Sequence, residues 1–374
     1  MGLDEMETMN PKQYKNILVN ALVNLGDVVL TTSAVALLRK IYPQARITML
    51  VRPVVREAVE NNPVIDEVLI FDYKAKENSW SKMWSMLQEI KSRHFDLSIS
   101  FDRKSRPAIL CFLAGIPTRV GADRVFDDKP SKVTYLYTHT VHIAHDLENT
   151  LQAETYQEIV RGFSGSDAHA VPVMARIPAA SQRKAVQLLD SLPADKRKIA
   201  LCVRGTFPLK TWPKEYFAAV VTELQRKFDG AFFVVGAPGD KPYADEVIAA
   251  CKAAVKVNAE LSGIKEKLPI LNFCGETSLL DLAALFQQID LFVTVDTGAT
   301  HIAATTGVKM VTVYGCTSPK RWHPYNVNAR VLSYEPACCP CKISAEECPS
   351  WPRPECLWKV TPEMVLAKCD ELMD

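Results

Sequence analysis

An aspartate follows the first apolar run of the chain, where a strand pattern gives way to a helical one. The stretch ILVNALVNLGDVVLTTSAVALLRKIYP, residues 17–43, passes through Gly26 and Asp27. The unpaired N–H groups and the dipole of a helix N-terminus hold a carboxylate there in its charged form. Asp27 is therefore either a simple helix N-cap or a base that takes a proton from a substrate hydroxyl.

A second strand end carries residues suited to phosphate. In FVTVDTGATHIAATTGV, residues 292–308, an apolar run leads into Asp296 and then into a helix that contains His301. Gly298 permits close backbone approach, and the outward N–H groups of the first turn can seat phosphate oxygens. Simple capping by Asp296 or Thr297 is the alternative, and His301 alone is more typical of a structural side chain. The sequence has neither a G-x-G-x-x-G nor a Walker G-x-x-x-x-G-K-[ST] fingerprint.

A third strand end, CVRGTFPLKTWP at residues 202–213, carries Thr206 and Lys210 ahead of a helix. A lysine beside a phosphate seat can neutralise the charge of a departing diphosphate, a task that other enzymes give to a metal ion. A lone lysine is more typical of a solvated surface. The functional interpretation of Lys210 therefore depends on the phosphate seat lying nearby.

The composition limits the kind of protein that holds these residues. A chain of 374 residues is too long for one ordinary core, so two domains are expected. The 44 Lys and Arg residues nearly cancel the 43 Asp and Glu residues, which argues against a nucleic-acid partner. The sequence has no apolar run of membrane-spanning length and no hydrophobic core of a signal peptide. A cytoplasmic protein that at most touches a membrane is expected.

Apolar runs alternate with helical patterns along the whole chain, which predicts an α/β fold with two parallel sheets. The expected strands are Asn16–Val23, Arg46–Val51, Glu67–Phe71, Phe95–Phe101, Thr118–Gly121, Lys198–Val203, Ala231–Val235, Leu271–Phe273, Leu291–Val295 and Met310–Tyr314. A polar, proline-punctuated stretch at residues 162–178 is the expected linker. Ligands bind at the carboxyl ends of such strands, so two facing sheets predict a cleft and favour a two-substrate enzyme.

Five cysteines lie close together near the end of the chain: Cys338, Cys339, Cys341, Cys348 and Cys356. A thiol cluster in a reducing compartment more often indicates a metal than disulfides. The spacing is not that of a standard zinc finger. A structural zinc ion at Cys339, Cys341, Cys348 and Cys356 and a set of free buried thiols are both compatible with it.

Four stretches in this order resemble glycosyltransferase family 9, the ADP-heptose:lipopolysaccharide heptosyltransferases, and above all its heptosyltransferase II-like branch. They are GDVVLTTSAVALLRKIYPQARITMLV, KTWP, VTVDTGATHIAATTGVKMVTVYG and CCPCKISAEECP. The resemblance implies a GT-B architecture of two Rossmann-like domains. Residues 1–170 are then the acceptor domain and residues 171–360 the nucleotide-sugar domain. A closing helix within residues 361–374 is expected to pack back toward the first domain.

The resemblance also implies roles for single residues. Asp27 is then the general base of an inverting transfer, and Lys210 stabilises the departing diphosphate. The implied donor contacts are Thr206, Asp240, Glu276, Thr277, Asp296, Thr297, Gly298, Ala299 and His301. Of these, Asp240 is expected near the ribose and Glu276 and Thr277 near adenine, although Thr277 or Ser278 is equally compatible with a helix N-cap. Because these groups can replace a cation, no cofactor is expected in catalysis.

Basic residues gather in FDRKSRPA and GADRVFDDKPSK, in the first half of the chain. They are Arg103, Lys104, Arg106, Arg119, Arg124, Lys129 and Lys132. A solvated surface is the default interpretation of such runs. With the resemblance, Arg103, Lys104, Arg106 and Arg124 are expected to meet an anionic acceptor, the lipopolysaccharide core or lipid A phosphates at the inner membrane.

The expected function is therefore the transfer of heptose from an ADP-sugar to a lipopolysaccharide inner-core acceptor. Two alternatives share the phosphate seat. One is a GT-B transferase or epimerase that uses another nucleotide-sugar. The other is a non-catalytic nucleotide-sugar binding protein, which needs the seat but not Asp27.

Overall fold

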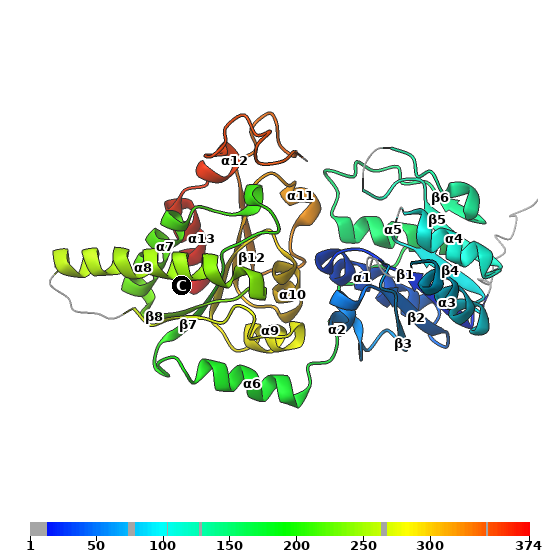
Figure 1. Ribbon diagram of the computed structural model, residues 1–374, viewed down its shortest axis with the longest axis horizontal. Helices are drawn as coiled ribbons and strands as arrows, with labels where there is room; N and C mark the ends of the chain where they lie inside the picture. The colour runs from blue at the N-terminus through cyan, green and yellow to red at the C-terminus, as the bar shows by residue number, and fades with distance from the viewer. Residues whose placement is uncertain (1–12, 74–78, 103, 127–128, 263–267, 342) are drawn as a thin grey trace, which may run out of the picture.

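The computed structural model describes residues 13–73, 79–102, 104–126, 129–262, 268–341 and 343–374. Two lobes lie side by side, and each is built on a six-stranded sheet (Figure 1). Every strand pair is parallel. The central strands are buried on both faces, which explains why they read as continuous apolar runs rather than as alternating ones.

The two sheets repeat one topology. The first has the order β3 (Glu67–Ile70), β2 (Arg46–Val51), β1 (Asn16–Asn20), β4 (Leu97–Ser100), β5 (Thr118–Ala122) and β6 (His139–Val141). The second has the order β9 (Ile270–Asn272), β8 (Gly230–Val234), β7 (Arg197–Cys202), β10 (Leu291–Val295), β11 (Met310–Tyr314) and β12 (Ala329–Ser333). In each, the order reverses between the first strand and the fourth, which opens a crevice at the carboxyl ends of those two strands.

Helices connect the strands of each lobe. The first lobe contains α1 (Leu25–Ile41), α2 (Arg56–Val59), α3 (Ser79–Ser92), α4 (Ser105–Leu113) and α5 (Gln152–Ser164), with the 3₁₀ turns η1 (Pro53–Val55) and η2 (Thr134–Leu136). The second contains α6 (Ala179–Leu189), α7 (Lys214–Phe228), α8 (Lys241–Ser262), α9 (Leu279–Phe286), α10 (Gly298–Thr306), α11 (Pro319–Trp322), α12 (Glu355–Trp358) and α13 (Pro362–Met373), with η3 (Pro208–Lys210) and η4 (Pro238–Asp240). No helix in the described part of the chain is both long and apolar enough to cross a membrane.

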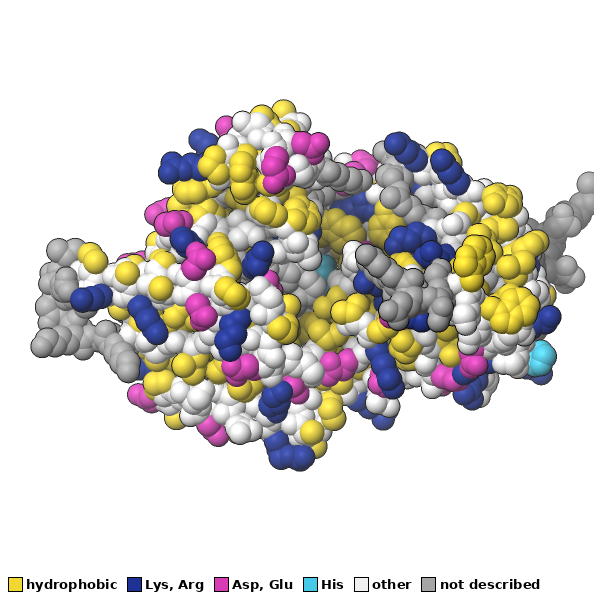
Figure 2. All heavy atoms as spheres, viewed as in Figure 1, with side chains coloured by type: hydrophobic (Ala, Val, Ile, Leu, Met, Phe, Trp, Pro, Cys, Tyr) yellow, Lys and Arg dark blue, Asp and Glu magenta, His cyan; other side chains and the backbone are white. Residues whose placement is uncertain are grey.

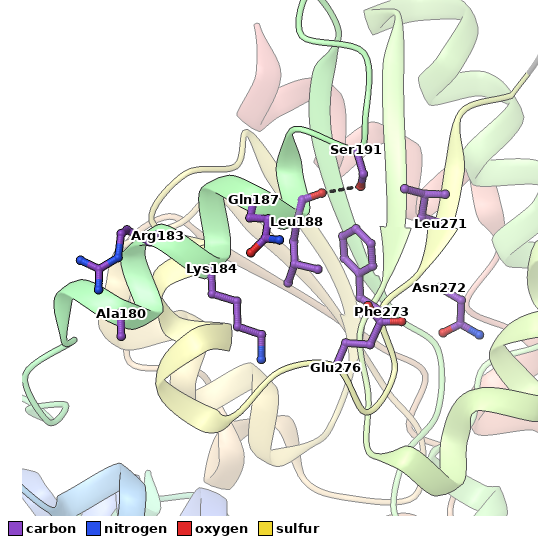
Figure 3. Close-up of a pocket in the computed structure, with 10 residues that line it drawn as sticks. All are labelled: Ala180, Arg183, Lys184, Gln187, Leu188, Ser191, Leu271, Asn272, Phe273 and Glu276. Carbon is purple, nitrogen blue, oxygen red and sulfur yellow. Dashed lines mark hydrogen bonds between the residues drawn. The ribbon is translucent and has the colours of Figure 1, made fainter.

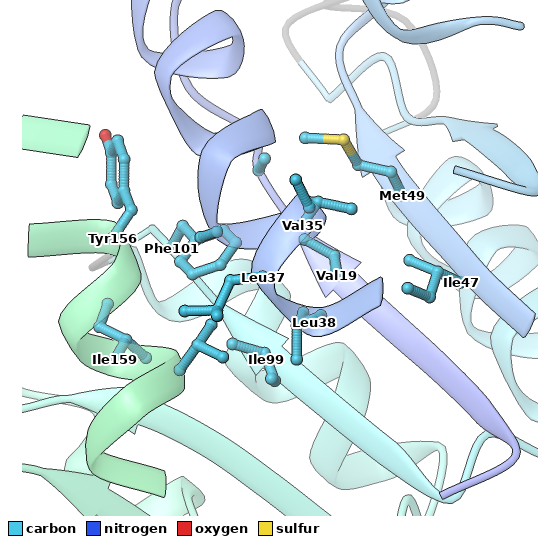
Figure 4. Packing of buried hydrophobic residues seen from close by; sticks show 14 of the residues in the cluster. Val19, Val35, Leu37, Leu38, Ile47, Met49, Ile99, Phe101, Tyr156 and Ile159 are labelled. Carbon is cyan, nitrogen blue, oxygen red and sulfur yellow. The ribbon is translucent and has the colours of Figure 1, made fainter. Parts of the chain in front are cut away.

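Helix α1 is the central element of the first lobe because it is buried on almost every side. Its residues from Asp27 to Leu38 are all buried, between the sheet and α5. Figure 4 shows Val35, Leu37 and Leu38 of α1 among strand residues such as Ile99, with Tyr156 and Ile159 of α5 beside them. Such an environment fixes the first turn of α1 rigidly, and with it the position of Asp27.

The structure differs from expectation at the edges of the sheets and at the C-terminus. Strands β6 and β12 were not expected, because both are short edge strands of mixed polarity. Helix α13 packs against α7 and β11 of the second lobe rather than back toward the first, and the C-terminus lies in that lobe (Figure 1). Its apolar stripe, Val365, Cys369 and Leu372, joins the core of the second lobe, so the expectation for this helix was wrong.

The linker is shorter than the expected residues 162–178. Helix α5 continues to Ser164, and the chain then stays hydrogen-bonded to the first lobe. The Val173 N–H donates to Thr32 Oγ1 (2.9 Å), and the Asn62 side chain donates to the carbonyl of Val173 (2.6 Å). We therefore propose a domain boundary close to Pro178, a few residues beyond position 170.

Candidate active site

The residues with a proposed chemical role follow the strands at which the strand order of each sheet reverses. Asp27 comes after β1, Lys210 comes after β7, and Asp296 comes directly after β10. Helices α1 and α10, which begin at these strand ends, pack against each other across the two lobes. Topology therefore brings together at one place three sites that lie far apart in the sequence.

Asp27 lies inside the first turn of α1 and is not its N-cap. The N-cap is Asn24, whose side chain makes no capping hydrogen bond. Asp27 is only 9% exposed, and its Oδ1 accepts a hydrogen bond from the hydroxyl of Tyr156 on α5 (2.9 Å). The simple capping interpretation of Asp27 is therefore wrong, and its carboxylate is held by a tertiary contact instead.

The protonation of Asp27 also differs from expectation. Burial raises its pKa from 3.8 to about 6, against the opposing effects of the Tyr156 hydrogen bond and of the positive charges of Arg321 and Lys210. The helix N-terminus was expected to keep this carboxylate ionised. Loss of water outweighs that effect, because a carboxylate enclosed by two lobes loses most of its hydration. A pKa near the operating pH is what a general base requires.

Lys210 and Asp296 form an ion pair on the second lobe. The Lys210 ammonium donates to Asp296 Oδ2 over 2.6 Å, and the hydroxyl of Thr317 donates to the same oxygen, also over 2.6 Å. Asp296 is 5% exposed, so the pair is largely removed from water. Asp296 is thereby fixed by two donors and does not cap α10.

The N-terminus of α10 faces the start of α1. Thr297 is its N-cap, as one of the alternatives predicted, and Thr297 Oγ1 accepts from the N–H of Ala299 (3.0 Å). A Cβ at Gly298 would lie 2.8 Å from Leu25 Cδ2, so a larger residue here would force the Leu25 side chain of α1 to move. The N-terminus of α10, the end of a helix that carries unpaired N–H groups, thus lies at the contact between the lobes.

His301 of α10 also contacts the start of α1. A Cβ at Gly26 would lie 2.6 Å from His301 Cδ2, so the ring packs directly on the backbone next to Asp27. Burial lowers the pKa of His301 to about 4, and its Nδ1 has no hydrogen-bond partner among the described residues. His301 is therefore neutral, and it contacts the turn of α1 that contains Asp27.

Two further contacts hold the lobes together. Arg321 of α11 is buried, and its guanidinium donates to Gln152 Oε1 (2.8 Å), to Glu148 Oε1 (2.9 Å) and to the carbonyl of Phe126 (2.8 Å) in the first lobe. Glu57 of α2 accepts the N–H of Leu279 (2.8 Å) at the start of α9. The structure is thus a closed arrangement in which Asp27 is covered by the second lobe.

The residues expected around the nucleotide lie at the carboxyl ends of β7, β8 and β9. Asp240 Oδ2 accepts the N–H of Ala237 (2.9 Å), and Asp240 Oδ1 lies 3.6 Å from Arg204. Glu276 is exposed, 3.9 Å from Lys241, and Thr206 is exposed as well. The N-cap of α9 is Ser278, which leaves the neighbouring Thr277 without that role.

A cavity of about 720 Å³ lies between α6 and the end of β9, away from the lobe interface. In Figure 3, Leu188 and Phe273 approach each other across it, with Lys184 and Glu276 nearby. Of the expected donor residues only Glu276 lines this cavity; Asp27, Lys210 and Asp296 do not. We therefore place the candidate active site at the lobe interface and not in this cavity.

Comparison with known proteins identifies the family of this chain. The sequence profile of glycosyltransferase family 9 (heptosyltransferase) matches residues 83–351, more than half of the chain. The chain belongs to glycosyltransferase family 9. Lipopolysaccharide heptosyltransferase 3 of Escherichia coli is 22% identical over 309 residues, which cover 81% of this chain and 83% of that protein.

Two solved structures share the fold of this family 9 glycosyltransferase. The family 9 glycosyltransferase of Veillonella parvula superposes with a TM-score of 0.80 at 24% identity, covering 96% of this chain and 98% of that one. The ADP-heptose lipopolysaccharide heptosyltransferase II of E. coli superposes with a TM-score of 0.75 at 20% identity, with the same coverage. The expected GT-B fold is confirmed.

The basic residues expected at the acceptor side of the family 9 enzyme divide into two groups. Lys104 and Arg106 lie at the start of α4, with their charges 5.8 Å and 4.6 Å from the ring centre of Tyr73. The guanidinium of Arg124 instead donates to the backbone carbonyl of Ile143, which makes it a support for the loop after β6. Arg103 lies outside the described residues.

The late cysteines of the family 9 enzyme border one cavity of about 270 Å³ together with Cys316. The thiols of Cys339 and Cys356 are hydrogen-bonded, and burial raises the pKa of Cys356 to about 11. No group of three or more His, Cys, Asp or Glu side chains within the described ranges is arranged to hold a metal ion.

Sequence reasoning missed three residues that build this site. Tyr156, Thr317 and Arg321 contact or influence Asp27 and Asp296, yet none of them stands in a recognisable motif. Tyr156 lies 129 residues from Asp27 in the chain, so only the packing of α5 on α1 brings the two together.

Proposed function

We propose that this enzyme transfers a heptose from ADP-heptose to a lipopolysaccharide inner-core acceptor, with inversion at the anomeric carbon. One observation carries the proposal. Asp27, a buried carboxylate, lies in a turn that packs on helix α10. Helix α10 begins just after Asp296, which forms an ion pair with Lys210. A base on one lobe facing an anion seat on the other is what the transfer of a sugar from a nucleoside diphosphate requires.

The proposed reaction uses side chains and backbone N–H groups at the interface. The acceptor hydroxyl loses its proton to Asp27 as its oxygen forms a bond to the anomeric carbon. The bond from that carbon to the diphosphate breaks, and ADP leaves with the electron pair. Lys210 and the first N–H groups of α10 stabilise the growing charge on ADP. Asp296, which orients Lys210, also faces the sugar.

The partners follow from this reaction. The donor is an ADP-sugar held mainly by the second lobe, and the acceptor is a lipopolysaccharide core sugar that approaches from the first lobe. We propose that Lys104 and Arg106, whose charges lie over the ring of Tyr73, bind acidic groups of such an acceptor. Because the acceptor carries lipid A, we propose that the enzyme works at the cytoplasmic face of the inner membrane.

A donor screen tests the function directly. Thermal unfolding is measured with ADP-heptose and with ADP-, UDP- and GDP-hexoses at one concentration. A ligand that binds only the folded state raises the melting temperature by an amount that grows with the logarithm of its concentration relative to its dissociation constant. ADP-heptose is expected to give the largest shift. ADP release is then expected only when a lipopolysaccharide core acceptor is present. Release without acceptor, or a larger shift with a UDP-sugar, contradicts the proposal.

The pH dependence of transfer is expected to report Asp27. Its pKa of about 6 predicts that kcat/KM falls as pH drops through 6, by about tenfold for each further pH unit, because the base becomes protonated. Tyr156 lowers this pKa by its hydrogen bond, so Tyr156→Phe should move the acid limb to higher pH. A rate profile that is flat from pH 5 to pH 8, or a limb that stays in place in Tyr156→Phe, contradicts the assignment.

We also propose that the late cysteines support the fold, with zinc held by Cys339, Cys341, Cys348 and Cys356. Their position around one cavity supports this, although the thiols must converge further to bind an ion. Metal analysis of the purified enzyme is expected to find one zinc per chain. A metal-free sample with an unchanged melting temperature would contradict the zinc site and indicate that the thiols are core residues.

A further inference from the structure

Large apolar side chains stand exposed on α3 and α4 of the first lobe. They are Trp80 (88% exposed), Trp84 (64%), Ile109 (37%), Phe112 (48%) and Leu113 (56%), here called the α3–α4 face. Figure 2 shows hydrophobic side chains gathered over these two helices. A group of this kind marks an interaction site, whereas apolar side chains exposed singly are ordinary.

The sequence of each helix places these residues on its outer side. Trp80 and Trp84 are four residues apart and share one stripe of α3, and Lys91 continues that stripe two turns later. On α4 the spacing of Ile109, Phe112 and Leu113 likewise places these three side chains on one side of the helix. The inner sides of both helices, with Ile90 of α3 and Leu110 of α4 among them, are already used by the core, so the exposed residues do not serve the packing of the lobe.

The charge around the α3–α4 face is mainly positive. Lys91 lies on α3, Lys104 and Arg106 lie at the start of α4, and the guanidinium of Arg119 lies 5.3 Å from the ring centre of Phe112. The nearest acidic side chain on α3, Glu89, is paired with Arg93 (2.6 Å). Exposed tryptophans bordered by Lys and Arg are the composition that binds a bilayer surface with anionic headgroups.

Helices α3 and α4 cover the face of the first sheet opposite to α1 and α5, at the end of the first lobe away from the second lobe (Figure 1). Helices α3 and α4 follow β3 and β4, so both begin at the edge of the sheet where Asp27 also lies. Trp80 is in the first turn of α3, and Lys104 directly precedes α4. A bilayer resting on this face would therefore lie against the first lobe, which is the proposed acceptor lobe.

We propose that the α3–α4 face docks the enzyme on an anionic lipid bilayer, with Trp80 and Trp84 inserted at the headgroup level. This inference rests on the proposed function for its purpose, since docking brings a lipid-linked acceptor to the cleft. The evidence for docking is independent of the proposed function and consists of the exposure, spacing and charge of these residues.

Vesicle sedimentation tests the docking. The full chain is mixed with vesicles of phosphatidylcholine alone, or of equal parts phosphatidylcholine and phosphatidylglycerol, at low and high salt. The wild type is expected to sediment with the anionic vesicles at low salt and much less with the neutral ones. The double variant Trp80→Ser/Trp84→Ser should bind at least about tenfold more weakly. Leu113→Ser should weaken binding too, through the other helix.

Val327→Ser is the matched control, because Val327 is 91% exposed but lies in the second lobe. It is expected to bind like the wild type. The docking is refuted if the wild type stays in the supernatant, if the tryptophan variant binds as well as the control, or if binding ignores the lipid charge. A change from dimer to monomer in the tryptophan variant would assign the face to a second copy of the chain instead.

Transfer to a lipid-free core acceptor separates this inference from the proposed function. The Trp80→Ser/Trp84→Ser variant should keep that activity, because neither residue lies at the lobe interface. If the wild type binds vesicles but transfers no heptose, the docking stands and the proposed function fails. If it transfers heptose but binds no vesicles, the reverse holds.

Discussion

Replacing Asp27 by asparagine is expected to reduce the turnover number about a thousandfold, the usual contribution of a general base. Donor affinity should remain nearly unchanged, because the ADP-sugar is held by the other lobe and Asp27 acts only when the acceptor hydroxyl is deprotonated. Single-turnover rates and the dissociation constant of ADP-heptose measure the two effects separately. A collapse of donor binding with normal turnover per bound donor contradicts the role of Asp27 as the base.

The stability of Asp27→Asn is the control for this experiment. The pKa of Asp27 is raised in the folded state, so the folded enzyme binds more protons than the unfolded chain between about pH 4 and pH 6. The free energy of unfolding therefore falls as pH rises through that window. Asparagine is neutral and nearly isosteric, so the variant should melt no lower than the wild type at pH 7. A loss of turnover with an unchanged melting temperature is then a loss of chemistry.

Lys210→Ala is expected to damage both donor binding and turnover. The charge of the diphosphate exists in the ground state and grows as the sugar departs, so a cation beside it contributes at both stages. We expect a loss of about a hundredfold in turnover and about tenfold in donor affinity. Lys210→Arg should retain most of the affinity because it keeps the charge, and transfer by the wild type should persist in EDTA.

The ion pair with Asp296 complicates the Lys210 experiment and also provides its control. Removing Lys210 leaves Asp296 buried with Thr317 as its remaining donor, which costs about 3 kcal/mol of stability. The double variant Lys210→Ala/Asp296→Asn removes both charges and should recover most of that stability without recovering turnover. If the double variant transfers heptose as fast as the wild type, Lys210 serves the fold and not the reaction.

The positions of the candidate active-site residues in the fold could be predicted because these residues follow strand ends. An apolar run that leads through Gly-Asp or Asp-Thr-Gly into a helix indicates a turn at the carboxyl end of a strand, and this local pattern located Asp27 and Thr297. The twelve strands were mostly recognisable because parallel strands are apolar on both faces. The short edge strands β6 and β12 lack that pattern and were missed.

The chemistry of Asp27 depends on tertiary packing and was therefore not predictable. Its raised pKa comes from burial, which outweighs the lowering effects of Tyr156 and Arg321, and both of these residues are distant from Asp27 in the sequence. The contact between Gly26 and His301 is of the same kind, since it exists only when α1 meets α10. The expectation for helix α13 was wrong for a related reason. An amphipathic stripe indicates that a helix packs on a core, but it does not indicate on which lobe.

The pH profile of single-turnover heptose transfer, measured for the wild type and for Asp27→Asn, tests the central claim most directly. We predict that the wild-type rate rises with pH and levels off above an apparent pKa near 6, whereas the variant is slow and shows no such rise. If Asp27→Asn keeps the acid limb of the wild type, another group accepts the proton, and the assignment of Asp27 as the base is wrong.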